Sequence, residues 1–164
     1  MRKRFTMILV LTTVLVIGCT SANDETPAPT EVPDPNAIAD PQHALDAART
    51  LWAANGGDDY DLTFSWQCFC GPDYNQRVNI EVRSATVEAG AVADTGVPLT
   101  PDWLAEYRTV EQLFDLVQQA IDENAAEIRA TYAADGYPTE VWIDFKRRTI
   151  DEERGFSIHA LQPT

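Results

Sequence analysis

The chain has 164 residues, 45% of them hydrophobic, and its 26 acidic against 12 basic residues give a formal net charge of −14. Such an acidic surface repels nucleic acid and anionic lipid headgroups, which excludes both as direct binding partners. The apolar fraction and the four tryptophans indicate a packed domain, so we interpret the acidic surplus as a source of solubility and not of disorder.

Residues 1–18 have the pattern of a lipoprotein signal peptide. A basic start over residues 2–4 precedes an apolar run over residues 7–17 that is too short to span a bilayer as a helix. The run ends in Val16-Ile17-Gly18-Cys19, which resembles a lipobox, the site where bacterial lipoproteins are acylated on the cysteine and cleaved before it. The alternative is an ordinary signal peptide with an incidental Cys19, but the usual A-x-A-like cleavage site is missing. We expect Cys19 to carry the membrane-anchoring lipid.

Residues 19–40 are predicted to form a tether behind that lipid. They are dense in proline, threonine and acid and have no hydrophobic period. Fully extended as polyproline II, about twenty such residues would hold a domain up to ~60 Å from the bilayer. The protein is therefore expected outside the cytoplasm, on the cell membrane or the outer membrane, with residues 41–164 forming a single domain.

The domain is predicted to begin with an amphipathic helix followed by three strands. Asp-Pro at 40–41 provides an N-cap and a first helical residue, and Gly-Gly at 56–57 ends the helical spacing of apolar residues. Strict alternation over residues 60–70 then predicts a half-buried strand rich in aromatic residues. Alternation also predicts a second strand over 77–83 and a third within 86–92.

The second half of the chain repeats this order. Residues 94–102 contain prolines and glycine and are predicted to be a loop, and Thr109 opens a second helix with a capping box to Gln112. Alternation on both sides of a turn predicts a hairpin over residues 128–145. A last short strand is expected with its buried side chains at Phe156, Ile158 and Ala160.

Helix, three strands, helix and three strands make an α+β pattern. Short connections make neighbouring strands antiparallel, so we expect a six-stranded antiparallel sheet with both helices packed on one face. The other face should carry polar side chains, with Trp142 as its aromatic exception. The polar side chains expected there are Thr63, Ser65, Gln67, Asn79 and Glu81.

The chain resembles a bacterial lipoprotein family known only as a domain of unknown function. The resemblance covers roughly residues 45–161, and its most specific element is Cys68-Phe69-Cys70 with the threonine-capped helix after it. It implies no reaction, ligand or partner. The other segments that carry it are Thr109-Val-Glu-Gln-Leu-Phe114, Gly136-Tyr-Pro-Thr139, and Ile143-Asp144 followed by Asp151-Glu152.

Catalytic and cofactor motifs do not occur in the sequence. The two histidines, His43 and His159, stand outside any motif, and hydrolase, P-loop and dinucleotide fingerprints are missing. We therefore expect a protein that is not an enzyme and has no cofactor. A group of turn acids could hold Ca²⁺, but its spacing fits no EF-hand loop and basic residues lie beside it, so no metal is predicted. These acids are Asp144, Asp151, Glu152 and Glu153.

The sharpest expectation concerns Cys68 and Cys70, the two cysteines left after lipidation of Cys19. An oxidising compartment favours their pairing, but on an extended strand their Cα atoms would lie ~6.6 Å apart, near the upper limit for a bridge. The strand must therefore pinch, which Gly71-Pro72 makes feasible. We predict a Cys68–Cys70 disulfide that ends the strand, with free thiols as the alternative.

Two functions of different classes remain open from the sequence. The first is a non-catalytic binding module for a protein or ligand of the cell envelope, with Trp142 and Phe69 as candidate binding residues. A Trp142 that is merely covered by a linker or loop is the alternative for that residue. The second function is thiol/disulfide redox chemistry or soft-metal binding by Cys68 and Cys70.

Overall fold

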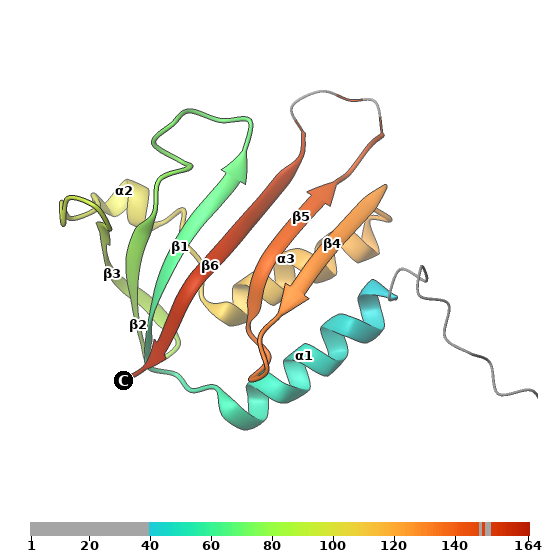
Figure 1. The fold of residues 1–164 in the computed structure, drawn as a ribbon, viewed down its shortest axis with the longest axis horizontal. Helices are drawn as coiled ribbons and strands as arrows, with labels where there is room; N and C mark the ends of the chain where they lie inside the picture. Colours follow the sequence, from blue (N-terminus) through green and yellow to red (C-terminus); the bar gives the residue numbers. More distant parts are fainter. Residues whose placement is uncertain (1–39, 148, 150–151) are drawn as a thin grey trace, which may run out of the picture. The chain divides into compact units, whose positions relative to one another are not determined.

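A computed structural model describes residues 40–147, 149 and 152–164, which form one six-stranded antiparallel sheet with helices (Figure 1). The predicted α+β class and the order of helices and strands are confirmed. The strands follow the order β3-β2-β1-β6-β5-β4 across the sheet. The elements are α1 (Pro41–Asn55), β1 (Tyr60–Cys68), β2 (Val78–Arg83), β3 (Thr86–Val92), α2 (Pro101–Leu104), α3 (Val110–Asp122), β4 (Glu127–Tyr132), β5 (Pro138–Asp144) and β6 (Arg154–Pro163).

The predicted signal peptide, Cys19 and residues 19–39 of the predicted tether lie outside the described residues. In the part of the chain that the structure describes, no helix is both long and apolar enough to cross a bilayer. The structure adds one helix that the sequence did not predict. The four-residue α2 begins inside the range predicted as a loop, where the Thr100 side chain accepts a hydrogen bond from the Trp103 amide.

Helices α1 and α3 pack on the same face of the sheet (Figure 1). The Asp40 side chain accepts a hydrogen bond from the Gln42 amide, which confirms the predicted N-cap of α1. The predicted capping box of α3 is also present, because Thr109 and Gln112 each accept the other's backbone amide. The core between helices and sheet contains large buried residues from α1, α3, β1, β2, β5 and β6, among them Leu45, Tyr60, Phe64, Ile80, Val110, Leu113, Phe114, Val117, Ile143 and Phe156.

A buried hydrogen bond fixes the start of β1 against the start of α3. The Tyr60 hydroxyl accepts from the Val110 amide at 2.8 Å, and Tyr60 is only 1% exposed. The first amides of a helix have no partner within the helix, so this contact satisfies a buried donor that would otherwise be unpaired. Burial, the largest influence, raises the pKa of Tyr60 far above its ordinary value.

The predicted third strand forms despite its unusual turn. Ser84 and Ala85 connect β2 to β3 with φ of 49° and 57°, the left-handed conformation that glycine or asparagine usually adopts in such a hairpin. The segment before β1 holds the turn in place. The Ser84 amide donates to the Asp59 carboxylate at 2.6 Å, and the Ala85 amide donates to the Asp58 carbonyl at 2.8 Å.

The last strand is longer than predicted, and different side chains of it face the core. β6 has ten residues because it pairs with β1 from Arg154 to Pro163, so the expectation of a short strand is wrong. Its first four residues also pair with β5. The register with β1 shifts between Thr63 and Phe64, where Ala160 and Ile158 are their partners. This bulge leaves Ala160 exposed, which corrects its predicted burial, and it brings Leu161 against the core.

Candidate functional site

The face of the sheet away from the helices, here called the open face, carries polar side chains that pair with one another. Thr63 donates to the Asn79 side chain at 2.9 Å across the β1–β2 ladder. Arg83 lies 2.8 Å from the Asp61 carboxylate and 3.7 Å from that of Glu81, two acids that stand directly opposite each other. This half of the open face is therefore internally satisfied and offers few free groups to a ligand.

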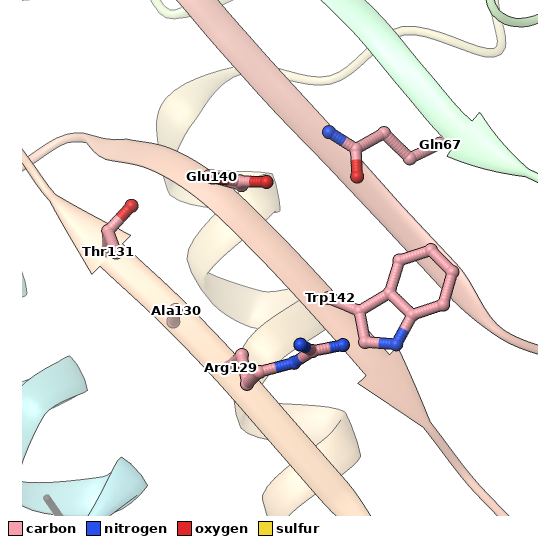
Figure 2. Close-up of a pocket in the computed structure, with 6 residues that line it drawn as sticks. All are labelled: Gln67, Arg129, Ala130, Thr131, Glu140 and Trp142. Carbon is pink, nitrogen blue, oxygen red and sulfur yellow. The ribbon is translucent and has the colours of Figure 1, made fainter.

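The other half contains one row of residues that crosses four strands. Gln67 on β1 stands opposite Gly155 on β6, Gly155 opposite Trp142 on β5, and Trp142 opposite Arg129 on β4. In Figure 2 the Arg129 side chain extends toward the Trp142 indole, whereas the Gln67 side chain extends across β6, where its amide donates to the Ser157 hydroxyl. Residues that stand opposite each other on one face have Cβ atoms about 5 Å apart, so the row forms a continuous surface, here called the Trp142 row.

Gly155 gives the row its shape, because a side chain there would occupy the space that the indole uses. A Cβ atom at this position would lie 3.1 Å from Cε3 of Trp142 and 3.4 Å from Cβ of Gln67, and it would collide with the Val141 carbonyl. The indole therefore lies against β6 and is half-buried by its own sheet. The prediction that Trp142 is the aromatic exception of the open face is confirmed.

A shallow hollow of about 360 Å³ lies over the Trp142 row toward the β4 edge (Figure 2). The Arg129 guanidinium carbon is 5.9 Å from the centre of the Trp142 ring, and Arg129 Nε is 3.2 Å from a Glu127 carboxylate oxygen. The lining combines one aromatic ring with amide, guanidinium, hydroxyl and carboxylate groups. The lining residues are Gln67, Arg129, Ala130, Thr131, Glu140 and Trp142.

A second hollow of about 400 Å³ lies on the other side of Trp142, at the end of β1. Trp142 and Phe69, the two candidate binding residues from the sequence, both line it. Phe69 follows the last residue of β1 and is 83% exposed. The structure thus brings together two aromatic side chains that are far apart in the sequence. The rest of the lining is Ser65, Trp66, Gln67, Cys68, Asn75 and Glu153.

Cys68 and Cys70 form a close pair on either side of Phe69. Their sulfur atoms are in contact and their Cα atoms are 5.2 Å apart, shorter than the spacing of an extended strand. β1 accordingly ends at Cys68, two residues earlier than predicted. Asn75 clamps the loop, because its side chain accepts from the Cys68 amide and donates to the Cys68 carbonyl, both at 3.4 Å. Phe69 is thereby presented on a short, constrained loop.

The two histidines lie in different settings. His43 is in the first turn of α1, away from the open face, whereas His159 Nε2 lies 2.9 Å from the Ser65 hydroxyl. Desolvation and, second, the charge of Arg77 lower the pKa of His159 from its ordinary value. In the described ranges no carboxylate is hydrogen-bonded to this imidazole, so the pair lacks the third group that orients a catalytic histidine.

The acids considered for a metal do not assemble into a site within the described ranges. Asp144, Glu152 and Glu153 are described and Asp151 is not. Among residues 40–147, 149 and 152–164, no three histidine, cysteine or acidic side chains are placed to share an ion.

Sequence reasoning missed three residues of this region: Arg129, Thr131 and Gly155. Arg129 and Thr131 lie within the predicted hairpin, but their place in one surface with Gln67 requires β6 to lie between β1 and β5, which no local pattern specifies. The one local signal was Gly155 inside an alternating stretch, because an isolated glycine in a strand can mark a close approach of another group.

Comparison with known proteins gives one match. A family model described as "Family of unknown function (DUF6174)" covers residues 44–163. No curated protein and no solved structure matches the chain.

Proposed function

Because the chain belongs to DUF6174, a family of unknown function, we propose its role from its own residues. The protein is a non-catalytic binding module, held outside the cytoplasm by lipid on Cys19. It presents the Trp142 row and Phe69 to a ligand or protein of the cell envelope.

The meeting of Trp142 and Phe69 in one hollow carries this proposal. Large exposed aromatic side chains are uncommon on a surface without a partner, and in binding interfaces they supply much of the binding energy. Phe69 contributes nothing to the core at 83% exposure, and the nearby cysteine pair restrains its loop. A restrained aromatic side chain loses little conformational freedom on binding, which favours affinity.

The test measures binding of the full chain to isolated cell-envelope fractions. Trp142→Ala and Phe69→Ala should each weaken binding at least about tenfold, since central aromatic residues of an interface typically account for more than 1.4 kcal/mol. Leu51→Ala is the matched control, because Leu51 is an apolar residue of α1 with 43% exposure. Unchanged binding by both aromatic variants would refute the proposal.

The anchor is tested separately. Cys19→Ala should release the protein from the membrane fraction or stall its processing, because the lipid would have no attachment site. Unchanged membrane association would contradict a lipid anchor on Cys19 and would leave the binding surface unaffected.

A second candidate function, redox chemistry or soft-metal binding, is favoured by the position of the cysteine pair. Cys70 is exposed, and Arg154 stands opposite Cys68 in the β1–β6 ladder, where its charge would favour a thiolate. Thiol titration of the unfolded, unreduced protein distinguishes the states. Two reactive thiols per chain would refute the bridge, whereas a Cys68→Ser/Cys70→Ser double variant with full envelope binding would refute a role for redox chemistry in binding.

A further inference from the structure

We propose that the Trp142 row binds a neutral oligosaccharide. This inference rests on the proposed binding function and names the ligand class. It follows from the shape of the aromatic surface, the polar groups around it and the local charge.

Trp142 offers a flat apolar surface in a shallow depression. Its indole lies against Gly155 on β6, so the sheet supports one side of the ring while hollows of about 360 and 400 Å³ open beside it. A sugar ring has an apolar face made of C–H groups, and such a face packs well on an aromatic ring. The depression is open and extends on both sides of Trp142, which suits a chain of sugar rings better than a compact ligand.

The polar side chains around the Trp142 ring can form hydrogen bonds with sugar hydroxyls. Glu140 provides carboxylate acceptors, and the Gln67 amide keeps its acceptor oxygen and one N–H, since its other N–H donates to the Ser157 hydroxyl. Arg129 keeps the donors of its terminal nitrogens, because only its Nε lies beside Glu127. Each sugar hydroxyl both donates and accepts, so it can pair with any of them. A purely apolar ligand would cover the remaining donors and acceptors without pairing them, which is unfavourable.

Local charge excludes the two classes of charged ligand. The whole chain carries −14, and Arg129 in the lining is already paired with Glu127 at 3.2 Å, so an anionic ligand gains little here. A cationic ligand would have to stack on Trp142, but the Arg129 guanidinium already takes the cation–π position over that ring, 5.9 Å from its centre. A neutral ligand is the class that remains.

The length of the row indicates more than one sugar ring. Gln67, Gly155, Trp142 and Arg129 stand on four neighbouring strands, and three strand spacings amount to ~14 Å. That span exceeds the width of a single ring. Phe69 lines the second hollow beside Trp142 and would offer a second apolar surface to a neighbouring ring.

The experiment titrates the full chain with cellotriose, maltotriose and chitotriose and follows binding by calorimetry and by saturation-transfer NMR. At least one of these neutral trisaccharides should bind. Trp142→Ala should weaken that binding at least about tenfold, and Gln67→Ala should weaken it by less. Leu51→Ala should bind as the unaltered chain does, and circular dichroism should show that all variants remain folded.

Several results would overturn the inference. They are the binding of no neutral trisaccharide, equal binding by Trp142→Ala, and tighter binding of a hexuronate trimer than of any neutral sugar. If no sugar binds while attachment to envelope fractions still depends on Trp142 and Phe69, the ligand is a protein or peptide and the binding function stands. If that dependence is also lost, both proposals fail.

Discussion

The two faces of the sheet are made by the same strands and have opposite chemistry. In β1, Tyr60, Leu62 and Phe64 point into the core and are at most 2% exposed, while Thr63 and Gln67 lie on the open face. Every large apolar residue on the core face is explained by packing against α1, α3 or a neighbouring strand. Trp142 on the open face packs against its own sheet at Gly155, while α1 and α3 lie on the other face. The contrast shows that an aromatic residue indicates function most clearly where the core does not need it.

Replacing one aromatic residue on each face should give the largest difference in the free energy of unfolding. Phe156 is fully buried and stacks on Phe64 with ring centres 5.6 Å apart, whereas Trp142 stands next to it in the ladder but on the open face. Phe156→Ala should lower the free energy of unfolding by about 3–5 kcal/mol, because it leaves a cavity. Trp142→Ala should lower it by about 1 kcal/mol or less. Urea denaturation measures both, and equal losses would mean that Trp142 belongs to the core.

The contact between the β4–β5 turn and α1 should be nearly as sensitive to substitution as Phe156. Gly136 has φ of +102°, and a Cβ atom there would collide with the backbone of α1 at Ala48 and Trp52. Gly136→Ala should therefore lower the free energy of unfolding by about 2–4 kcal/mol, through left-handed strain and overpacking. Gly96→Ala is the control, since Gly96 also has positive φ but lies in open space. A larger loss for Gly96→Ala would refute the role of close packing. Thermal denaturation of both variants provides the comparison.

Alkaline pH should destabilise the protein, because buried tyrosines on the core face would have to ionise. Burial raises the pKa of Tyr132 to about 12 and that of Tyr60 further, above the ordinary value of 10. The unfolded state therefore loses these protons first as pH rises. Stability should be constant below about pH 10 and fall between about pH 10 and 12, by about 1–2 kcal/mol for the partly exposed Tyr132. Tyr132→Phe should reduce this fall in denaturation curves across that range. If stability falls equally with pH in Tyr132→Phe and in the unaltered chain, Tyr132 does not have a raised pKa in the folded protein.

The smallest effect on stability concerns His159 on the open face, whose ionisation can be observed directly. NMR titration of His159 should give a pKa below 6.5, because desolvation and Arg77 disfavour the charged imidazole. Arg77→Gln should raise that pKa, whereas Arg129→Gln should leave it unchanged. The lowered pKa means that stability is present above about pH 6.5 and declines slightly as pH falls. A pKa above 6.5 would contradict the description of this contact.

The sequence was sufficient for features that local chemistry decides. The N-cap at Asp40, the capping box at Thr109 and the alternation in β1 predicted their elements correctly. Features set by long-range pairing were not accessible. The bulge that moves Ala160 off the core face depends on how β6 fits β1, and the contact of Ser65 with His159 joins residues 94 positions apart. Gln67 joins the Trp142 row for the same reason, because it stands opposite Gly155 on β6.

The position of β6 in the sheet has a consequence for the order of folding. β6 is the last strand in the sequence, yet it lies between β1 and β5 and joins the two halves of the sheet (Figure 1). The β1–β2–β3 meander and the β4–β5 hairpin can each form from nearby residues, but β1 and β6 pair Tyr60 with Pro163. Closing so long a loop is slow. A chain that emerges N-terminus first therefore cannot complete this sheet until residues 154–163 are free, and until then β1 and β5 have unpaired edges that a chaperone could shield.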